Sequence, residues 1–387
     1  MKLLIVTRER QEDQRFGLGK SMHNIMIELR KKGHHVDYFS LINWQNRDWE
    51  KLKKYELFFL KLFKILNLTP ELSGAVAERW LQGRNAIKLA RENDYTHVWF
   101  QDPWLALALL PQQLVSKTKF KWGISEHGLG SFIRAVGFDG LNVNQKTLNW
   151  FSQLERLLLR KANWVFCPSK TALNQLYMDL NVKYPQPHWS ILFYGLPSIT
   201  LKPYDEARIE LNWPTGVCHV IAVGRESTVK RYEVLIQACA KAEKLINKTI
   251  QLVIIGAHGS EQLNRISEEI GLRSKPLYYI TDNVDIFLSA ADFYISTSEH
   301  ESFGLANQEA IAAGLPSIIT AGGAAVEVSG YGAWIVSGNS NTLAQAIAYF
   351  VENNQWRENW RTLAVAQKKQ WPTWDKVIYE CEKKLND

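Results

Sequence analysis

Short apolar runs, each the length of a β-strand, alternate with helical segments along most of this chain. The first run, Lys2–Thr7, is followed by a polar loop, a helix predicted over Met22–Lys32 and a second run, His35–Ser40. A strand, a helix and a second strand in this order form a βαβ unit with parallel strands. The same alternation begins again at Cys218. The pattern therefore predicts an α/β fold with two parallel sheets.

A segment with three prolines separates the two series of strands and helices. A chain of 387 residues is too long for one ordinary core and suits two domains of about 150 to 200 residues each. We expect residues 1–196 to form an N-terminal Rossmann-like domain and residues 217–370 a C-terminal one. Residues 197–216, which contain the prolines, are predicted to be the linker.

The cysteines and the lengths of the apolar runs indicate the cellular compartment to expect for this protein. The four cysteines lie far apart and form no CxxC pair, so we interpret them as small apolar residues of a reduced protein without disulfides or a zinc site. The N-terminal apolar run is too short for a signal peptide. No apolar run approaches the length that crosses a bilayer. We therefore expect a cytoplasmic protein.

The net charge of +7 is distributed unevenly between the two halves. Residues 1–196 hold 28 Lys and Arg against 17 Asp and Glu, a net +11, and the rest of the chain holds 18 against 22, a net −4. The imbalance indicates that the first half meets an anionic partner. We expect that partner to be a membrane surface or a substrate, and not a nucleic acid.

The stretch Thr297–Thr320 combines a glycine turn with two carboxylates. It follows an apolar strand, turns at Gly304 and continues as a helix, with Glu301 before the turn and Glu309 in the helix. A helix N-terminus after a parallel strand favours phosphate, whereas carboxylates accept hydrogen bonds from sugar hydroxyls. The combination points to a ligand with both groups, such as a nucleotide sugar. The alternative is that two glutamates eight residues apart simply lie on a solvated helix.

Two other candidate sites lie in the first half. Gly17 and Gly19 occur where the chain leaves the first strand, which favours a ligand-side loop, although a flexible surface turn fits equally well. The sequence excludes a P-loop and an intact GxGxxG motif there. His127 follows the strand Phe120–Ser125, at the sheet edge where open α/β folds bind ligands. It could also be an ordinary loop histidine.

A basic amphipathic helix is predicted over residues 48–66. One face carries Leu52, Tyr55, Phe59, Leu62, Phe63 and Leu66, the opposite face carries four lysines, and Phe58 and Ile65 widen the apolar side. Such a helix suits the surface of an anionic membrane. The alternative is a helix that packs on its own domain while its lysine side chains extend into water.

Taken together, these motifs resemble the retaining GT-B glycosyltransferases, specifically nucleotide-sugar-dependent family 4. The resemblance is strongest over residues 224–336, and its motifs occur in the family's order and spacing: Gly224-Arg225 with Lys230, Glu301-Ser302-Phe303-Gly304, Glu309-Ala310 through Gly314-Leu315-Pro316, and Gly322-Gly323 with Glu327. It implies two Rossmann-like domains facing a central cleft. It also implies that the last segment, 371–387, is a helix that crosses back to the N-terminal domain.

The resemblance implies a role for each donor-site residue. Arg225 and Lys230 would hold the diphosphate, assisted by backbone N–H groups around Gly304 and Leu305. Glu301 would accept hydrogen bonds from the donor sugar and Glu309 from the ribose. The donor-binding set would be completed by Phe303 and by Gly17 and Gly19, whose loop would close over phosphate or acceptor.

The resemblance also implies the chemistry. His127 would sit near the reacting sugar, and the absence of a DxD motif agrees with transfer that needs no metal and no other cofactor. Retention in the family is usually explained by displacement on one face of the sugar, so no nucleophile is assigned. Two residues depart from the family pattern: Arg231 stands where Gly is usual and Thr297 where Pro is common.

We therefore expect a retaining glycosyltransferase that moves a sugar from an NDP-sugar, with UDP- and GDP-sugars as first candidates, to a glycan or lipid-linked acceptor in bacterial cell-surface polysaccharide biosynthesis. Residues 48–66 would hold it on the inner face of the cytoplasmic membrane. Two alternatives remain open. A GT-B sugar-nucleotide epimerase would turn over the nucleotide sugar without an acceptor. A non-catalytic nucleotide-sugar-binding subunit would bind it without turnover.

Overall fold

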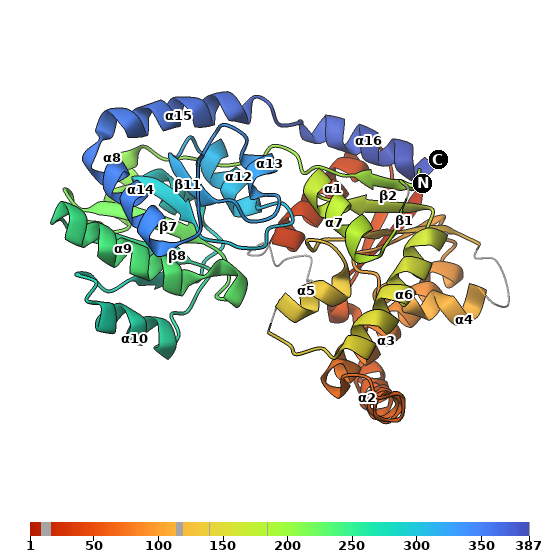
Figure 1. Ribbon diagram of the computed structural model, residues 1–387. Helices are drawn as coiled ribbons and strands as arrows, with labels where there is room; N and C mark the ends of the chain where they lie inside the picture. Colours follow the sequence, from red (N-terminus) through yellow and green to blue (C-terminus); the bar gives the residue numbers. More distant parts are fainter. Residues whose placement is uncertain (9–16, 114–118, 139, 184, 387) are drawn as a thin grey trace. The chain divides into compact units, whose positions relative to one another are not determined.

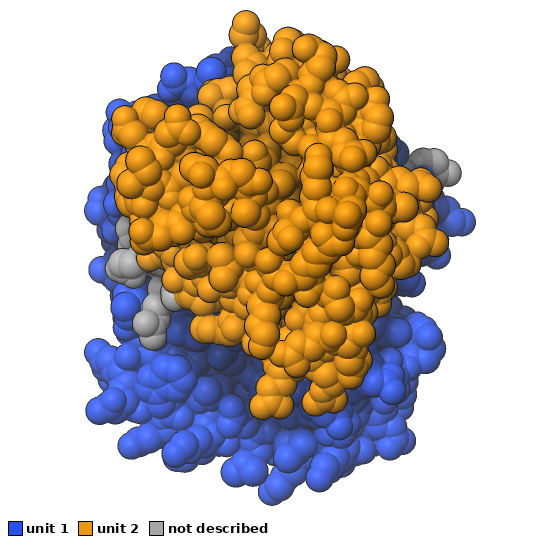
Figure 2. Space-filling view, turned by 90° about the vertical axis from the view of Figure 1, so that its left-hand side faces the viewer, with its two compact units in different colours: residues 1–194, 373–387 blue, residues 195–372 orange. Residues whose placement is uncertain are grey.

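The computed structural model describes residues 1–8, 17–113, 119–138, 140–183 and 185–386 (Figure 1). The chain divides into two compact units, which Figure 2 distinguishes by colour. Unit 1 comprises Met1–Tyr194 and Thr373–Asp387, and unit 2 comprises Gly195–Pro372. Each unit contains one parallel six-stranded sheet with helices around it. The predicted α/β fold with two Rossmann-like domains is confirmed.

The sheet of unit 1 has the strand order β2-β1-β3-β4-β5-β6. Its strands are β1 (Lys2–Val6), β2 (His35–Phe39), β3 (His97–Phe100), β4 (Lys121–Ser125), β5 (Trp164–Cys167) and β6 (Trp189–Ile191). Its α-helices are α1 (Gly17–Lys31), α2 (Asn46–Leu66), α3 (Ser73–Glu92), α4 (Leu110–Gln113), α5 (Phe132–Phe138), α6 (Gln145–Lys161), α7 (Lys170–Asp179) and α16 (Trp374–Asn386). Short 3-10 helices η1 (Leu41–Asn43), η2 (Pro70–Leu72) and η3 (Leu105–Leu109) connect some of them.

The central strands of unit 1 are apolar on both faces because helices cover both. Every residue of β3 and β5 is buried, as expected for interior strands of a parallel sheet. Large side chains fit only where a neighbour is small. A Cβ atom on Gly123 of β4 would lie 2.1 Å from the Trp164 ring, so glycine makes room there for the buried indole of β5.

The C-terminal helix α16 belongs to unit 1, as predicted. It buries Val377, Ile378, Cys381 and Leu385 in one cluster with the apolar side of α1. Glu382 forms an ion pair with Lys32 at 2.8 Å, and Lys121 Nζ donates to the carbonyl of Asn386 at 2.8 Å. The return of the last segment to the N-terminal domain therefore has both an apolar and an ionic basis.

The sheet of unit 2 has the strand order β12-β11-β10-β7-β8-β9. Its strands are β7 (Cys218–Val223), β8 (Ile250–Ile255), β9 (Leu277–Tyr279), β10 (Phe293–Ser296), β11 (Ser317–Thr320) and β12 (Trp334–Val336). Its helices are α8 (Tyr204–Glu210), η4 (Thr228–Lys230), α9 (Tyr232–Ile246), α10 (Glu261–Ile270), α11 (Asp285–Ala290), α12 (Leu305–Ala312), α13 (Ala325–Ser329), α14 (Ser340–Glu352) and α15 (Asn354–Lys368).

The segment 197–216, predicted as a linker, lies within unit 2 and contains α8. Pro203 is the N-cap residue of this helix, and Ala207 and Arg208 are buried. The Arg208 guanidinium forms an ion pair with Asp292 at 2.6 Å and donates to the carbonyl of Ala290 at 3.0 Å. The prolines suggested an extended connection, but here one of them starts a helix.

One expectation about a helix of unit 1 also differs in the structure. Gly17 and Gly19 lie in the first turn of α1, which begins five residues earlier than the helix predicted over Met22–Lys32. The ligand-side loop predicted at Gly17 and Gly19 is thus helical, and the polar loop before it, residues 9–16, lies outside the described residues. The apolar face predicted for residues 48–66 packs inward in α2: Leu52 and Phe63 are buried, and the Phe59 ring lies 6.0 Å from that of Trp80 in α3.

Candidate functional site

The candidate donor site lies where the strand order of unit 2 reverses. From β7 the chain moves through β8 and β9 on one side, then returns to β10 on the other side of β7. The carboxyl ends of two such strands flank the crevice in which open α/β sheets bind ligands. The loop after β7 contains Arg225 and leads to Lys230, and the loop after β10 contains Glu301 and leads to Gly304. Topology thus brings these segments to one edge of the sheet.

Lys230 and Glu301 meet at this edge as an ion pair. Lys230 Nζ lies 2.7 Å from Glu301 Oε1, and the two side chains are only 21% and 14% exposed. An ammonium group has three N–H donors and a carboxylate has two acceptor oxygens. Among the described residues each is the other's single side-chain partner. The pair therefore keeps two donors and one acceptor oxygen for a ligand.

Hydrogen bonds hold the two loops together beneath this ion pair. The Glu299 amide donates to the carbonyl of Val229 at 3.0 Å. The Thr297 hydroxyl donates to the carbonyl of Lys230 at 2.6 Å and lies 3.3 Å from that of Arg231. Arg231 has φ of +52° and thus takes the left-handed conformation that favours glycine. The two residues that depart from the family pattern are therefore direct neighbours.

The Lys230 side chain runs across the backbone of Gly224. A Cβ atom on Gly224, which has φ of +151°, would lie 2.6 Å from Lys230 Cε. The Tyr232 hydroxyl donates to the carbonyl of Gly224 at 2.8 Å, and burial together with nearby Glu301 raises the pKa of this phenol, so it stays protonated. Arg225 follows Gly224 directly and is exposed. Tyr232 was not among the predicted site residues, although its position as the first residue of the helix after this loop could have indicated it.

Gly304 starts α12 three residues beyond Glu301. It is the N-cap residue with φ of +91°, and a Cβ atom there would lie 2.9 Å from Asn307 Nδ2. Leu305 is the first residue of the helix, and Glu309 lies one turn later on the same side. Both are partly buried, and Phe303 is buried. The N-terminus of α12 supplies the positive end of a helix dipole near Lys230.

His127 and the first-half glycines lie in unit 1, so the structure groups them separately from the unit 2 residues. His127 follows β4, as predicted. Its Nε2 lies 2.9 Å from Gln101 Oε1 and its Nδ1 lies 2.9 Å from the Tyr194 hydroxyl. A proton on Nε2 can donate to the amide oxygen, and Nδ1 then accepts from tyrosine. Burial lowers the pKa of His127 to about 4, so the ring is neutral at pH 7.

Glu126, next to His127, is a buried acid. Neither of its carboxyl oxygens has a hydrogen-bond partner among the described residues. Burial raises its pKa well above the usual range, and Glu155 and Asp102 raise it further. Burial therefore favours the protonated, uncharged form of this carboxyl group.

Sequence reasoning also missed the partners of His127. Gln101 follows β3 directly and Tyr194 comes shortly after β6. Both positions lie at the carboxyl edge of the same sheet, and inspection of every strand end would have singled them out.

Two other features are absent from the described part of the chain. It contains no group of three or more His, Cys, Asp or Glu side chains placed to hold a metal ion. None of its helices is both long and apolar enough to cross a membrane.

Comparison with known proteins places this geometry in context. Residues 204–366 match the family described as glycosyl transferases group 1. Mannosylfructose-phosphate synthase of Agrobacterium fabrum is 26% identical over 275 residues, 64% of this chain and 59% of that protein. Lipopolysaccharide glucosyltransferase WaaG of Escherichia coli is 27% identical over 125 residues, 32% of each protein. The chain thus matches less than two thirds of the length of either relative.

A solved structure resembles the whole chain. HepE of Anabaena in complex with UDP-glucose has a TM-score of 0.72 and 16% identity, and the match covers 100% of this chain and 99% of that one. At this identity the likeness establishes the fold, which is GT-B. The family match lies entirely within unit 2.

Proposed function

We propose that this protein is a retaining, metal-independent glycosyltransferase of family 4. It transfers a sugar from an NDP-sugar to a glycan or lipid-linked acceptor in bacterial cell-surface polysaccharide biosynthesis. One observation carries the proposal: the Lys230–Glu301 ion pair stands at the strand-order reversal of unit 2, beside the N-terminus of α12. That edge combines groups for a diphosphate with groups for sugar hydroxyls.

The positive groups act on the leaving diphosphate. When the bond between the sugar C1 and the phosphate oxygen breaks, negative charge develops on the diphosphate. Lys230, with two N–H donors beyond the one directed at Glu301, and Arg225 stabilise that charge together with the dipole of α12. Fixed cations of this kind need no metal ion.

The carboxylates act on the hydroxyl groups of the donor. Glu301 Oε1 is engaged by Lys230, so Oε2 accepts from a hydroxyl of the transferred sugar, while Glu309 accepts from the ribose. The acceptor oxygen bonds to C1 on the face that the diphosphate leaves. Its proton passes to the departing phosphate oxygen, and the anomeric configuration is retained. The ring of His127 is neutral and adds no charge, and its two nitrogens are bonded to Gln101 and Tyr194.

The known relatives guide the choice of first substrates. HepE was solved with UDP-glucose, and WaaG is a lipopolysaccharide glucosyltransferase by name. UDP-sugars are therefore tested first, with GDP-sugars next, against lipid-linked or polysaccharide acceptors.

A second part of the proposal is attachment to the inner face of the cytoplasmic membrane through α2. Its inward face is occupied by α3, but Leu57, Phe58 and Ile65 remain 60%, 57% and 77% exposed. Lys53, Lys54, Lys61 and Lys64 are exposed around them. An exposed apolar stripe bordered by lysines suits an anionic lipid surface.

The donor assignment is tested with a panel of UDP-, GDP-, ADP- and dTDP-sugars in thermal-shift and turnover assays. One nucleotide sugar should raise the melting temperature by mass action. Glu301→Gln should keep the fold but lose most turnover, whereas Glu352→Gln, a change at the end of α14, should lose little. NMR of the product should show the donor's anomeric configuration, and EDTA should not inhibit. Turnover without acceptor, or full activity of Glu301→Gln, would contradict the proposal.

The membrane part has its own test. Phe58→Ser with Ile65→Ser should reduce co-sedimentation with anionic vesicles at low salt by at least about tenfold. Full burial of each side chain is worth about 1.5–3 kcal/mol, and partial insertion of the pair already exceeds the figure of about 1.4 kcal/mol that corresponds to a tenfold change. Leu245→Ser, at an apolar residue of unit 2 that is 63% exposed, serves as the control. Equal binding of both variants, or no binding by the unmodified protein, would remove this part.

A further inference from the structure

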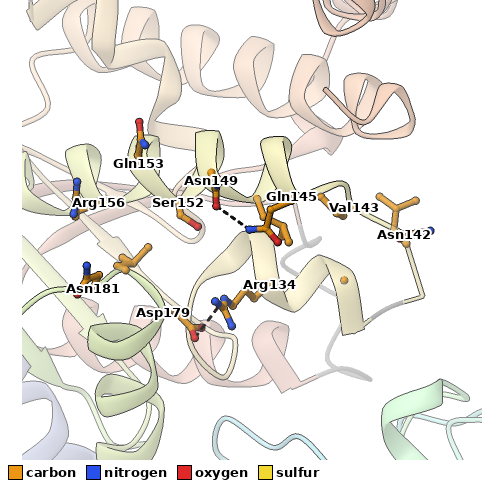
Figure 3. Close-up of a pocket in the computed structure, with 14 residues that line it drawn as sticks. Arg134, Asn142, Val143, Gln145, Asn149, Ser152, Gln153, Arg156, Asp179 and Asn181 are labelled. Carbon is orange, nitrogen blue, oxygen red and sulfur yellow. Dashed lines mark hydrogen bonds and ion pairs between the residues drawn. The ribbon is translucent and has the colours of Figure 1, made fainter. Parts of the chain in front are cut away.

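A hollow in unit 1 is lined by residues other than those assigned above. It has a volume of about 710 Å³ and is bounded by α5, by the segment 140–144, by one face of α6 and by the end of α7. Its size falls within the range of about 300 to 1,000 Å³ that is typical of sites for small ligands. Figure 3 shows the α6 side chains in a row along the hollow, with Arg134 and Asp179 below them.

The α6 helix supplies the hollow with a mainly polar face, interrupted by Leu148. Gln145, Asn149, Ser152 and Arg156 follow one another at helical spacing and line it, while Thr147, Phe151, Glu155, Leu158 and Leu159 are buried on the other side. A polar helix face is normally just solvated. This one differs because α5 and the segment before α6 wall it into a concave surface.

The amide groups in this row are arranged to bind hydroxyls. Gln145 Nε2 donates to Asn149 Oδ1 at 2.9 Å, so the Gln145 oxygen and the Asn149 nitrogen remain available as an acceptor and a donor. A sugar hydroxyl both donates and accepts, and therefore matches such a pair. The Ser152 hydroxyl, about one turn further along α6, can both donate and accept a hydrogen bond.

The charge in the hollow favours an anion. Arg156 makes no hydrogen bond or ion pair with any described residue. Arg134 is 57% exposed and lies 3.5 Å from Asp179 Oδ1, a distance too long for a strong ion pair. Asp179 is already satisfied by the Gln175 side-chain amide at 2.8 Å and by the Ser131 amide at 2.9 Å. Among the described residues that line the hollow, two guanidinium groups are thus only partly balanced by one carboxylate. Guanidinium groups bind phosphate and carboxylate in a bidentate manner.

The hollow is connected to the loop that carries His127. The segment 126–131 runs from the end of β4 into α5, and its last residue, Ser131, donates to Asp179 at the wall of the hollow. Gly130 has φ of +88°, and a Cβ atom there would lie 2.1 Å from Asp179 Oδ2. The His127 loop is therefore fixed against one wall of the hollow.

We propose that this hollow is a subsite for an anionic sugar unit of the acceptor, one that carries a phosphate or a carboxylate beside its hydroxyls. Arg156 and Arg134 bind the anion, and Gln145 and Asn149 bind the hydroxyls. The proposal rests on the proposed transferase function, because it identifies the acceptor as an anionic glycan.

The test uses the full chain and calorimetric titration with four probes: glucose 6-phosphate, glucuronate, glucose and inorganic phosphate. The two anionic sugars distinguish a phosphate from a carboxylate as the bound group. Glucose 6-phosphate or glucuronate should bind at least fivefold more tightly than both glucose and inorganic phosphate. Equal affinity for inorganic phosphate would overturn the sugar part of the proposal, and equal affinity for glucose would overturn the anion part.

Matched arginine variants on α6 locate the site. Arg156→Gln should weaken binding of the preferred anionic sugar by about tenfold, consistent with loss of one or two charge-assisted hydrogen bonds in a solvent-accessible hollow. Arg160→Gln removes the same charge one turn later, outside the lining, and should change affinity less than twofold. Equal losses in both variants would show an effect of net charge and overturn the assignment. The nucleotide-sugar thermal shift, measured on the same variants, should be unchanged, so failure here is distinguishable from failure of the donor site.

Discussion

The two sheets of this protein share a fold but differ in strand order. Counted from its own first strand, unit 2 has the order 3-2-1-4-5-6 of dinucleotide-binding sheets, whereas unit 1 has the order 2-1-3-4-5-6, which extends the flavodoxin-like order by one strand. Both orders contain one reversal, between β7 and β10 in unit 2 and between β1 and β3 in unit 1. Each unit thus has one edge of the kind at which open α/β sheets bind ligands.

The chemistry at the two edges is different. In unit 2 a lysine and a glutamate meet as a partly buried ion pair. In unit 1 Gln101, His127 and Tyr194 form a chain of hydrogen bonds, and burial keeps the imidazole neutral and the phenol protonated. Charge suits a diphosphate, whereas neutral donors and acceptors suit hydroxyls. The two edges therefore share a backbone plan, and a few residues after the strands make one edge charged and the other neutral.

The largest expected effect comes from removing the charge at the unit 2 edge. Lys230→Ala should lower kcat/KM by roughly 10²- to 10³-fold, about 3–4 kcal/mol in the transition state, because a fixed donor to the leaving group is lost. Steady-state kinetics with the preferred nucleotide sugar measures it. Lys244→Ala, at an exposed lysine of α9, is the control and should lose less than twofold. If Lys230→Ala also keeps more than half of the activity, the charge of Lys230 does not contribute to catalysis.

Much of this arrangement could be predicted from sequence because periodicity and strand ends are local signals. Apolar runs identified the strands, and the family resemblance implied the C-terminal helix. Lys230 and Glu301 are 71 residues apart, but both follow strands, and the resemblance supplied the information that these strands are neighbours.

The remaining features depend on contacts that no local pattern records. The prolines of 197–216 gave no sign that Ala207 and Arg208 would be buried against unit 2. The apolar face of α2 was visible, but not that α3 would cover it and leave Phe58 and Ile65 exposed. The partners of His127 lie 26 and 67 residues away, so pairing them requires the folded sheet.

The second prediction concerns the helix start that completes the charged edge. Gly304→Ala should reduce the free energy of unfolding of unit 2 by about 2–3 kcal/mol. The left-handed backbone costs about 1–2 kcal/mol, and the added methyl group would lie 2.9 Å from Asn307 Nδ2, whose side-chain oxygen is held by Tyr294. Urea unfolding followed by circular dichroism measures the loss.

Gly271→Ala separates the two causes of that loss. Gly271 ends α10 with φ of +75°, and a Cβ atom there meets nothing within 4 Å. This variant should therefore cost only the backbone part, about 1–2 kcal/mol. Equal destabilisation by both substitutions would mean that the Asn307 contact contributes nothing at the start of α12.

The third prediction tests whether the unit 1 edge is neutral. The pKa of His127 is lowered to about 4 in the folded protein, against about 6.5 in an unfolded chain. The unfolded state therefore binds a proton first as pH falls below 6.5, and stability is lost between about pH 6.5 and 4. At pH 5 this loss reaches about 2 kcal/mol relative to pH 7.5, because a shift of one pKa unit corresponds to about 1.4 kcal/mol.

His127→Gln cannot take up that proton, and it keeps a polar side chain. Its stability relative to the unmodified protein should therefore improve by up to about 2 kcal/mol between pH 7.5 and 5, measured by urea unfolding at each pH. His258→Gln, at an exposed histidine of unit 2, should show no such trend. A pH-independent difference for His127→Gln would mean that the ring titrates in the folded protein as it does in the unfolded chain, and the lowered pKa of His127 would be refuted.

The smallest effect is expected at the residues that depart from the family pattern. Thr297→Val removes the hydroxyl that binds the carbonyl of Lys230 and approaches that of Arg231. It should cost about 1 kcal/mol of stability, the usual worth of one such hydrogen bond, and raise KM for the nucleotide sugar a few-fold because Lys230 is less well fixed. Arg231→Gly relieves the left-handed strain at that position. If the hydroxyl serves to hold this strained turn, Thr297→Val should cost measurably less in the Arg231→Gly background. Strict additivity in this double-mutant cycle would mean that the two departures are independent, and that the charged edge does not depend on their coupling.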